Sequence, residues 1–140
     1  MDVNLWAVLI CGVVSLVLGS IWYGAMFGKL WMRLCGMDMN MDAAARKEAQ
    51  KKAMPLYFVQ LVLSLFQAWV LSLYITGAID EMTGVSNAFW IWAAFVMPTI
   101  AGSVMWAGET NKTKWTKFFL QTGFQLICFI VFALIIVAMM

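Results

Sequence analysis

The sequence has no histidine, three cysteines and two prolines, and only 11% of its 140 residues carry a charge. Histidine and closely spaced cysteines are the usual ligands of haem, zinc and iron–sulfur sites, and Cys11, Cys35 and Cys128 form no such pair. We therefore expect no cofactor, no metal site and three reduced thiols. The long apolar segments contain no carboxylate, lysine or histidine, which disfavours catalysis and proton-coupled transport.

Apolar residues are what the sequence has in excess: they make up 64% of it, and its mean hydropathy is +0.88. Such a composition lies outside that of soluble domains. About 20 apolar residues are needed for a helix to cross a bilayer, and lipid offers no partner to an open strand. The sequence predicts one all-α membrane domain, residues 1–140, with four transmembrane helices at about 5–27, 55–77, 87–107 and 118–139.

The first apolar run lacks the basic segment and the cleavage site of a secretory signal, so we expect it to stay attached. All nine basic residues lie in the first and third connections, which share one side of a four-span chain, while Asp2, Asp80 and Glu81 are the charged side chains of the other side. Because basic loops stay in the cytoplasm, we expect both termini outside (N-out/C-out) and a bacterial inner (plasma) membrane. The basic residues are Lys29, Arg33, Arg46, Lys47, Lys51, Lys52, Lys112, Lys114 and Lys117.

Tryptophan supports the same boundaries, because its ring favours the interface between lipid and water. Seven of the eight tryptophans lie near the end of a predicted span, and Trp69 alone is deep. We interpret these seven as interfacial anchors: Trp6, Trp90 and Trp92 outside, and Trp22, Trp31, Trp106 and Trp115 inside.

The connection at about 28–54 is the largest part predicted to lie outside lipid. From Asp42 to Ala53 it is rich in helix formers, and Glu48 can pair with Lys52 one turn later. We expect a short cytoplasmic helix here, followed by Pro55 in the first turn of the second span. Topology explains its basic residues, and contact with anionic lipid headgroups is a minor additional role for Arg46, Lys47, Lys51 and Lys52.

The run WYGAMFGKLW, residues 22–31, resembles the DUF1761 family of small four-span membrane proteins. The residues that carry the resemblance are Trp22, Tyr23, Gly24, Phe27, Gly28, Lys29 and Trp31. This chain has Ala25 where the family usually has proline, and Glu109 and the segment 121–125 are weaker echoes, without the histidine that members carry after the glycine. The resemblance implies a four-span architecture and no activity. From the residues alone, the run is either an anchored helix exit or the rim of a binding site.

Small residues recur at helical spacing in two of the spans. They are expected to bring helix backbones close together. The first and third spans are therefore expected to cross tightly, either within one chain or between two chains. Pro98 also removes a backbone hydrogen bond and should kink the third span. The small residues are Gly12, Ser15 and Gly19 in the first span and Ala94, Pro98 and Gly102 in the third.

Polar side chains inside the spans have two interpretations. Buried amides and hydroxyls often bond helices to one another, or they can line a polar vestibule that opens to the cytoplasm. Most of them lie in the half of the bilayer next to the basic loops. They are Ser20, Tyr23, Gln60, Ser64, Gln67, Ser103, Gln121 and Gln125.

Two functions remain open after these considerations. The first is a non-catalytic protein that acts by helix association, as a homo-oligomer or as an accessory subunit of a membrane complex. The second is a small channel or transporter-like conduit, or a lipid- or solute-binding protein, that uses the polar vestibule. The one-sided charge predicts that any partnering copies are parallel. The apolar composition predicts membrane lipids as surroundings, and we expect no nucleic-acid partner because no folded basic domain presents the basic residues.

Overall fold

The computed structural model of the chain describes residues 2–37, 40–77 and 83–140, so Asp80 and Glu81 lie outside the described residues. Every described element is a helix: six are α-helices, and two short segments, η1 and η2, are π-helical turns. The elements are α1 (Leu5–Ser20), η1 (Ile21–Met26), α2 (Gly28–Leu34), α3 (Ala43–Gly77), α4 (Thr83–Ile91), η2 (Trp92–Val96), α5 (Met97–Met105) and α6 (Asn111–Ala138).

Four of the helical segments are long and apolar enough to cross a membrane: Leu5–Met26, Ala43–Gly77, Gly84–Met105 and Asn111–Ala138. Large apolar side chains cover their outer faces; Trp6 is 72% exposed and Phe95 is 70% exposed. A soluble protein rarely exposes apolar surface on this scale. The chain is therefore an integral membrane protein, as its composition predicted.

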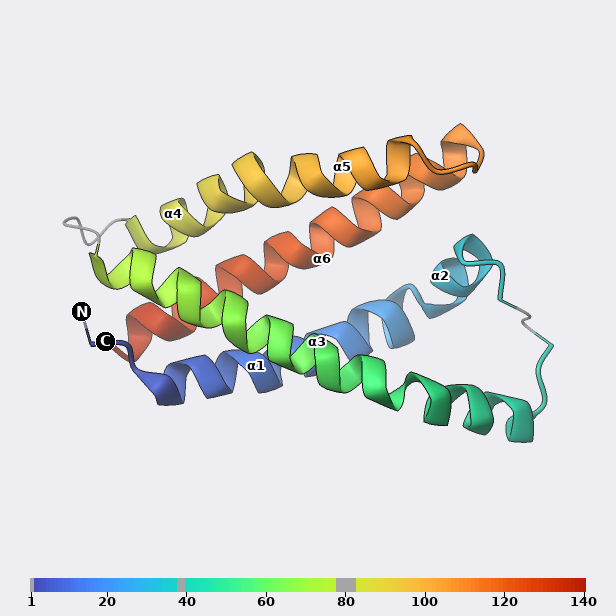
Figure 1. Cartoon of the computed structure of the whole chain (residues 1–140), viewed down its shortest axis with the longest axis horizontal. Coiled ribbons are helices and arrows are strands. Elements are labelled where there is room, and N and C mark those ends of the chain that lie inside the picture. Colours follow the sequence, from blue (N-terminus) through green and yellow to red (C-terminus); the bar gives the residue numbers. More distant parts are fainter. Residues whose placement is uncertain (1, 38–39, 78–82) are drawn as a thin grey trace.

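The bundle is organised around α6, which packs against α1, α3, α4 and α5. α1 also packs along α3, and α3 contacts α4. Both chain termini lie at one end of the bundle, which we call the terminal end (Figure 1). The first turns of α3 and of α6, which carry basic residues, lie at the other end, which we call the basic end (Figure 1).

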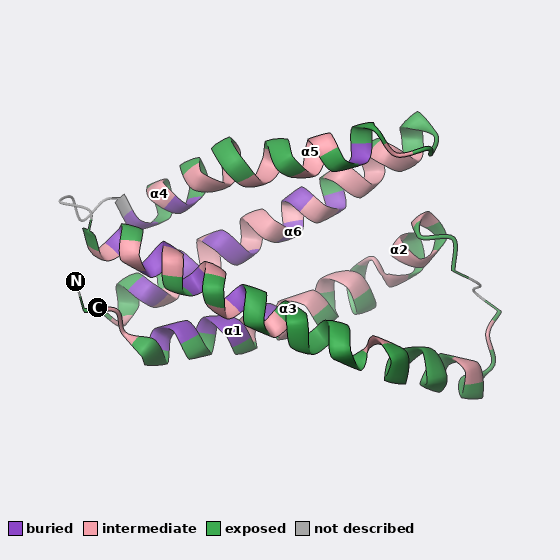
Figure 2. Cartoon of the chain, viewed as in Figure 1, coloured by how far each residue is buried: buried purple, intermediate pink, exposed green. Residues whose placement is uncertain are grey.

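The core lies in the terminal half of the bundle, where purple segments of α1, α3, α4 and α6 face one another in Figure 2. Every buried residue of α3 falls within its second half, from Ser64 to Ile75. The first half of α3 diverges from α6 toward the basic end (Figure 1). The helices are therefore tightly packed at one end and spread apart at the other. The buried apolar residues that meet there include Cys11, Ala68, Leu71, Phe132 and Ile136.

Asn4 ties the terminal end together. Its side-chain oxygen accepts hydrogen bonds from the amides of Trp6 and Ala7, which caps α1. Its side-chain nitrogen donates to the carbonyl oxygen of Met139 at 2.9 Å, just beyond the last turn of α6. One side chain thus satisfies groups at the beginning of α1 and at the end of α6.

The predicted helix at 42–53 forms, but it is not a separate element, and this corrects the sequence-based boundary. It continues into the second span as one 35-residue helix, α3, with Pro55 inside it. Proline removes one helical hydrogen bond, which is tolerated here because Pro55 and Lys51, whose carbonyl loses its partner, are exposed at the basic end. Asp42 caps the helix through the amide of Ala45 at 2.7 Å. The predicted pair of Glu48 and Lys52 is confirmed, at 3.8 Å.

Candidate functional site

The stretch at 22–31 packs against the middle of α6. Where α1 ends, the chain makes the π-helical turn η1, which changes the direction of the side chains that follow. The indole nitrogen of Trp22 donates to the carbonyl oxygen of Leu120 at 3.1 Å. The ring of Trp22 also lies where a Cβ atom on Gly123 would be in van der Waals contact, at 3.5 Å. Trp22 is therefore held against α6.

A second tryptophan reaches α6 from the third span. The π-helical turn η2 ends immediately before the Met97–Pro98 start of α5, at the interruption that Pro98 predicted. The indole nitrogen of Trp92 donates to the carbonyl oxygen of Thr122 at 3.0 Å. Trp22 and Trp92 thus bind carbonyl groups two residues apart on α6. We call Trp22 and Trp92 the tryptophan clasp.

A row of polar residues, Lys117, Gln121 and Gln125, follows α6 at intervals of four residues. We call it the polar stripe. Four-residue spacing keeps the three side chains on one face, and the stripe lies between buried neighbours on both sides, such as Phe124 and Thr122. Gln121 and Gln125 are nevertheless only half-buried. The first half of α3, which contains no buried residue, diverges from α6 toward the basic end (Figure 1).

Gln125 has an unusual environment for an amide. Its side-chain oxygen is buried, and no donor among the described residues reaches it. Buried polar atoms of proteins nearly always have a hydrogen-bond partner. Among the described residues it is the one buried side-chain oxygen or nitrogen without such a partner.

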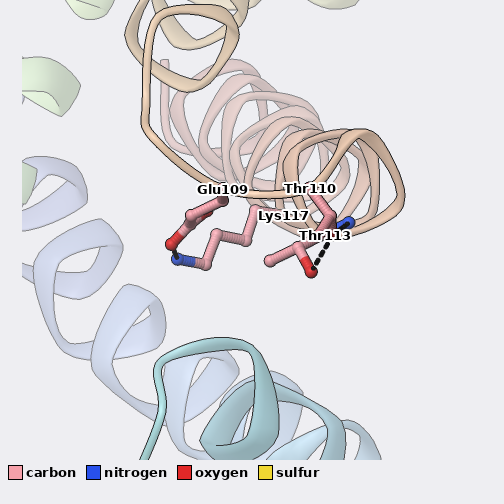
Figure 3. Close-up of polar contacts among 4 residues, drawn as sticks. All are labelled: Glu109, Thr110, Thr113 and Lys117. Carbon is pink, nitrogen blue, oxygen red and sulfur yellow. Dashed lines mark hydrogen bonds and ion pairs between the residues drawn. The ribbon is translucent and has the colours of Figure 1, made fainter.

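The polar stripe ends in an ion pair at the basic end. Lys117 donates to the carboxylate of Glu109, and Thr110 caps the first turn of α6 by accepting from Thr113 (Figure 3). Both charged side chains are shielded, with 16% of Lys117 and 34% of Glu109 exposed. Sequence reasoning counted Lys117 as a loop charge and missed its place in the stripe. Its four-residue spacing from Gln121 was the available signal.

Cys35, just beyond α2, lies within electrostatic reach of this pair. Burial raises the pKa of the Cys35 thiol; Lys117 acts in the opposite direction, and Glu109 adds to the rise. The thiol is therefore predominantly protonated at neutral pH and is a poor nucleophile. Among the described residues no group of three or more Cys, Asp or Glu side chains gathers in a way that could hold a metal ion.

The eight predicted polar residues do not meet around one vestibule. Ser20 and Ser103 are exposed and donate to carbonyls of their own helices. Exposed Gln60 donates to the buried hydroxyl of Ser64 one turn later at 3.3 Å, and Gln67 is half-buried on the same helix. The structure therefore separates these five from the polar stripe.

Tyr23 is the predicted polar residue that joins Gln121 and Gln125. Its ring lies edge-on to Phe124, with centroids 5.2 Å apart, and 4.8 Å from the ring of Trp31. Phe27 packs on Trp22 with centroids 4.7 Å apart. Of the other residues of the motif, Gly24 and Lys29 are exposed and Gly28 is half-buried.

The two groups of small residues have different surroundings. A Cβ atom at Gly12 would lie 2.5 Å from Leu65 of α3, and one at Gly19 would lie 3.5 Å from Phe124 of α6. Ser15 is buried and donates to the carbonyl of Gly12. Ala94 and Pro98 are exposed, and Gly102 has no neighbour within 4 Å.

The expected crossing of the first and third spans is therefore wrong for a single chain. Within the described residues, α1 packs on α3 and α6 rather than on α4 or α5. The small residues of the third span face away from the bundle.

The tryptophans also fall into two groups, one that faces outward and one that packs against α6. Trp6, Trp90, Trp106 and Trp115 are exposed, as anchors require, and Trp31 is half-buried. Trp22 and Trp92 point inward to α6 instead, because a carbonyl there accepts each indole N–H. The N–H groups of these two tryptophans are therefore engaged in helix packing, and their placement at the interface stays a prediction.

Comparison with known proteins gives one family. The profile of a family described as "Protein of unknown function (DUF1761)" matches residues 6–137, which is nearly the whole chain. No curated protein and no solved structure matches the chain.

Proposed function

The chain belongs to the DUF1761 family, whose function is not known, and we propose from its geometry that it is a non-catalytic integral membrane protein that acts by helix association. It does so as a parallel homo-oligomer or as an accessory subunit of a membrane complex. The observation that carries this proposal is the outward face of the third span. Only 11% of that span is buried, compared with 39% of the fourth.

The outward face has the features of a helix contact in lipid. Ala88 and Val104 are buried on the inner side of the span. On the opposite side Ala94, Pro98 and Gly102 leave the backbone accessible, and small residues of this kind allow close helix packing. The comparable feature of the first span, Gly12, is already occupied by α3. The third span therefore remains available to a partner.

This proposal includes an orientation. Basic residues are excluded from the outer ends of membrane proteins, so the basic end lies in the cytoplasm and both chain termini lie outside, in a bacterial inner membrane. An enzymatic reporter that works only in the cytoplasm should be inactive when fused after Met140 and active when inserted after Gly36, in the exposed connection beyond α2. The reverse pattern would overturn the orientation. One fixed orientation also makes any partnering copies parallel.

The test of association is the mass of the detergent-solubilised particle. We expect Gly102→Leu to convert the oligomer or complex into single chains and to leave their helicity unchanged, because Gly102 has space around it. Val59→Leu is the matched control, since Val59 faces outward from α3 and is 51% exposed. A wild-type particle that is monomeric and free of any copurifying partner would contradict the proposal.

A conduit through the bundle has less support. Five of its eight candidate residues lie away from the polar stripe or bond within their own helix. The observation that still favours a role for the others is the unpaired oxygen of Gln125.

A further inference from the structure

The polar stripe needs a partner that the described chain does not supply. Gln121 and Gln125 lie inside the fourth span, and Gln125 is about 12 Å along the helix from Lys117. At that depth the surroundings of a bundle are hydrocarbon, which cannot form hydrogen bonds. The buried oxygen of Gln125 nevertheless has no donor. A molecule that offers an O–H or N–H group could satisfy this oxygen.

The charges around the stripe favour an uncharged molecule. The stripe has one charged member, Lys117, and the carboxylate of Glu109 neutralises it. The two glutamines bear no charge and present both donors and acceptors. A charged headgroup would enter the apolar layer without a partner of opposite charge, which is costly.

The walls of the site are aromatic, and one side is open to lipid. Tyr23, packed on Phe124, flanks the stripe on the side of η1. Trp92, bound to Thr122, flanks it on the side of η2. Gln121 and Gln125 are only half-buried, so part of each side chain faces outward from the bundle, and toward the terminal end the core residue Phe132 closes the bundle. A molecule that dissolves in the bilayer can reach this site sideways.

We propose that the polar stripe and its aromatic walls bind an uncharged, hydroxyl-bearing amphiphile from the bilayer. Its hydroxyl group donates to the side-chain oxygen of Gln125, and the amide of Gln121 bonds to a second oxygen of the same headgroup. Its apolar chain lies in the hydrocarbon layer beside the bundle. The terminal torsion of glutamine rotates over a broad range, so the oxygen of half-buried Gln125 can turn toward the ligand.

Binding of short-chain diacylglycerol tests this inference. Wild-type protein in nanodiscs should retain radiolabelled dioctanoylglycerol, and Gln125→Leu should weaken its binding about tenfold, which corresponds to one hydrogen bond. Gln125→Asn, which keeps an amide, should lose less. Gln60→Leu is the matched control, because Gln60 is an exposed amide on α3, and it should bind like the wild type. The helicity of each variant verifies its fold.

Three related probes distinguish the possible occupants. The O-methyl ether of dioctanoylglycerol, which has no donor, should bind about ten times more weakly; equal binding would overturn the proposal. Tighter binding of dioctanoyl phosphatidic acid would overturn the uncharged headgroup. Competition by glycerol alone would show a water-soluble ligand instead of an amphiphile. If Gln125→Leu changes the mass of the particle instead of lipid retention, the stripe is a protein interface, and the association proposed through Gly102 is judged separately.

Discussion

Replacing Trp22 by alanine should lower the free energy of unfolding by about 2–4 kcal/mol, somewhat below the ~3–5 kcal/mol typical of a large buried aromatic residue. We expect a smaller loss than in a soluble protein because lipid can cover the apolar surface that the substitution exposes. In a membrane, packing rather than the hydrophobic effect stabilises the contact between helices. Trp22 lies in the tryptophan clasp, bonds to Leu120 and contacts Phe27 and Phe124. Its removal leaves a cavity beside Gly123. Reversible unfolding in mixed micelles, followed by helical circular dichroism, measures the change.

Two further variants separate the contributions of the ring and of the hydrogen bond. Trp22→Phe keeps a ring but loses the N–H donor, so it should cost about 1 kcal/mol. Trp106→Ala removes a tryptophan that is 86% exposed and should change stability by less than the phenylalanine variant does. If Trp22→Ala proves no more harmful than Trp106→Ala, then Trp22 is an interfacial anchor and does not hold α6.

Gly12→Leu should destabilise the fold by about 2–3 kcal/mol, in the range of overpacked cores. Even the first atom of a side chain at Gly12 would meet Leu65 at 2.5 and 3.0 Å and Leu61 at 3.3 Å. α1 and α3 must therefore separate, which loosens the contact that joins the first two spans. The same unfolding titration measures the effect.

Gly102→Leu provides the matched comparison, because it adds the same side chain at a glycine without neighbours. It should leave the unfolding of the single chain unchanged and alter only the mass of the particle. Equal destabilisation by both variants would show that the two glycines have similar surroundings, contrary to the structure.

The positions of the four spans follow from the sequence because bilayer thickness sets a minimum length for an apolar helix. The two π-helical turns do not follow from it. A π-helical turn adds one residue to the helix and rotates everything after it, and hydropathy does not register a single added residue. This rotation is why Ala88 and Val104 share one side of the third span while Ala94 and Gly102 lie on another. Pro98 indicated where the interruption lies but not its form.

Only part of the candidate site was predictable from the sequence. Gln121 and Gln125 are conspicuous as amides in an apolar run, and the sequence identified both. The contacts of Trp22 and Trp92 with α6 were not predicted, because a tryptophan near the end of a span can reach either a headgroup or a neighbouring helix. Which of the two it reaches depends on the partner helix, and local sequence does not contain that information.

The hydrogen bond from Asn4 to Met139 holds the two ends of the chain close together. A few flexible residues would be enough to join the two ends, and new ends could then be opened in the exposed connection between α2 and α3. Such a circular permutant keeps every helix contact described above while moving both chain ends from the terminal end of the bundle to the basic end. The stability of this permutant would show how much of the fold depends on the helix contacts and how much on the order in which the helices are connected.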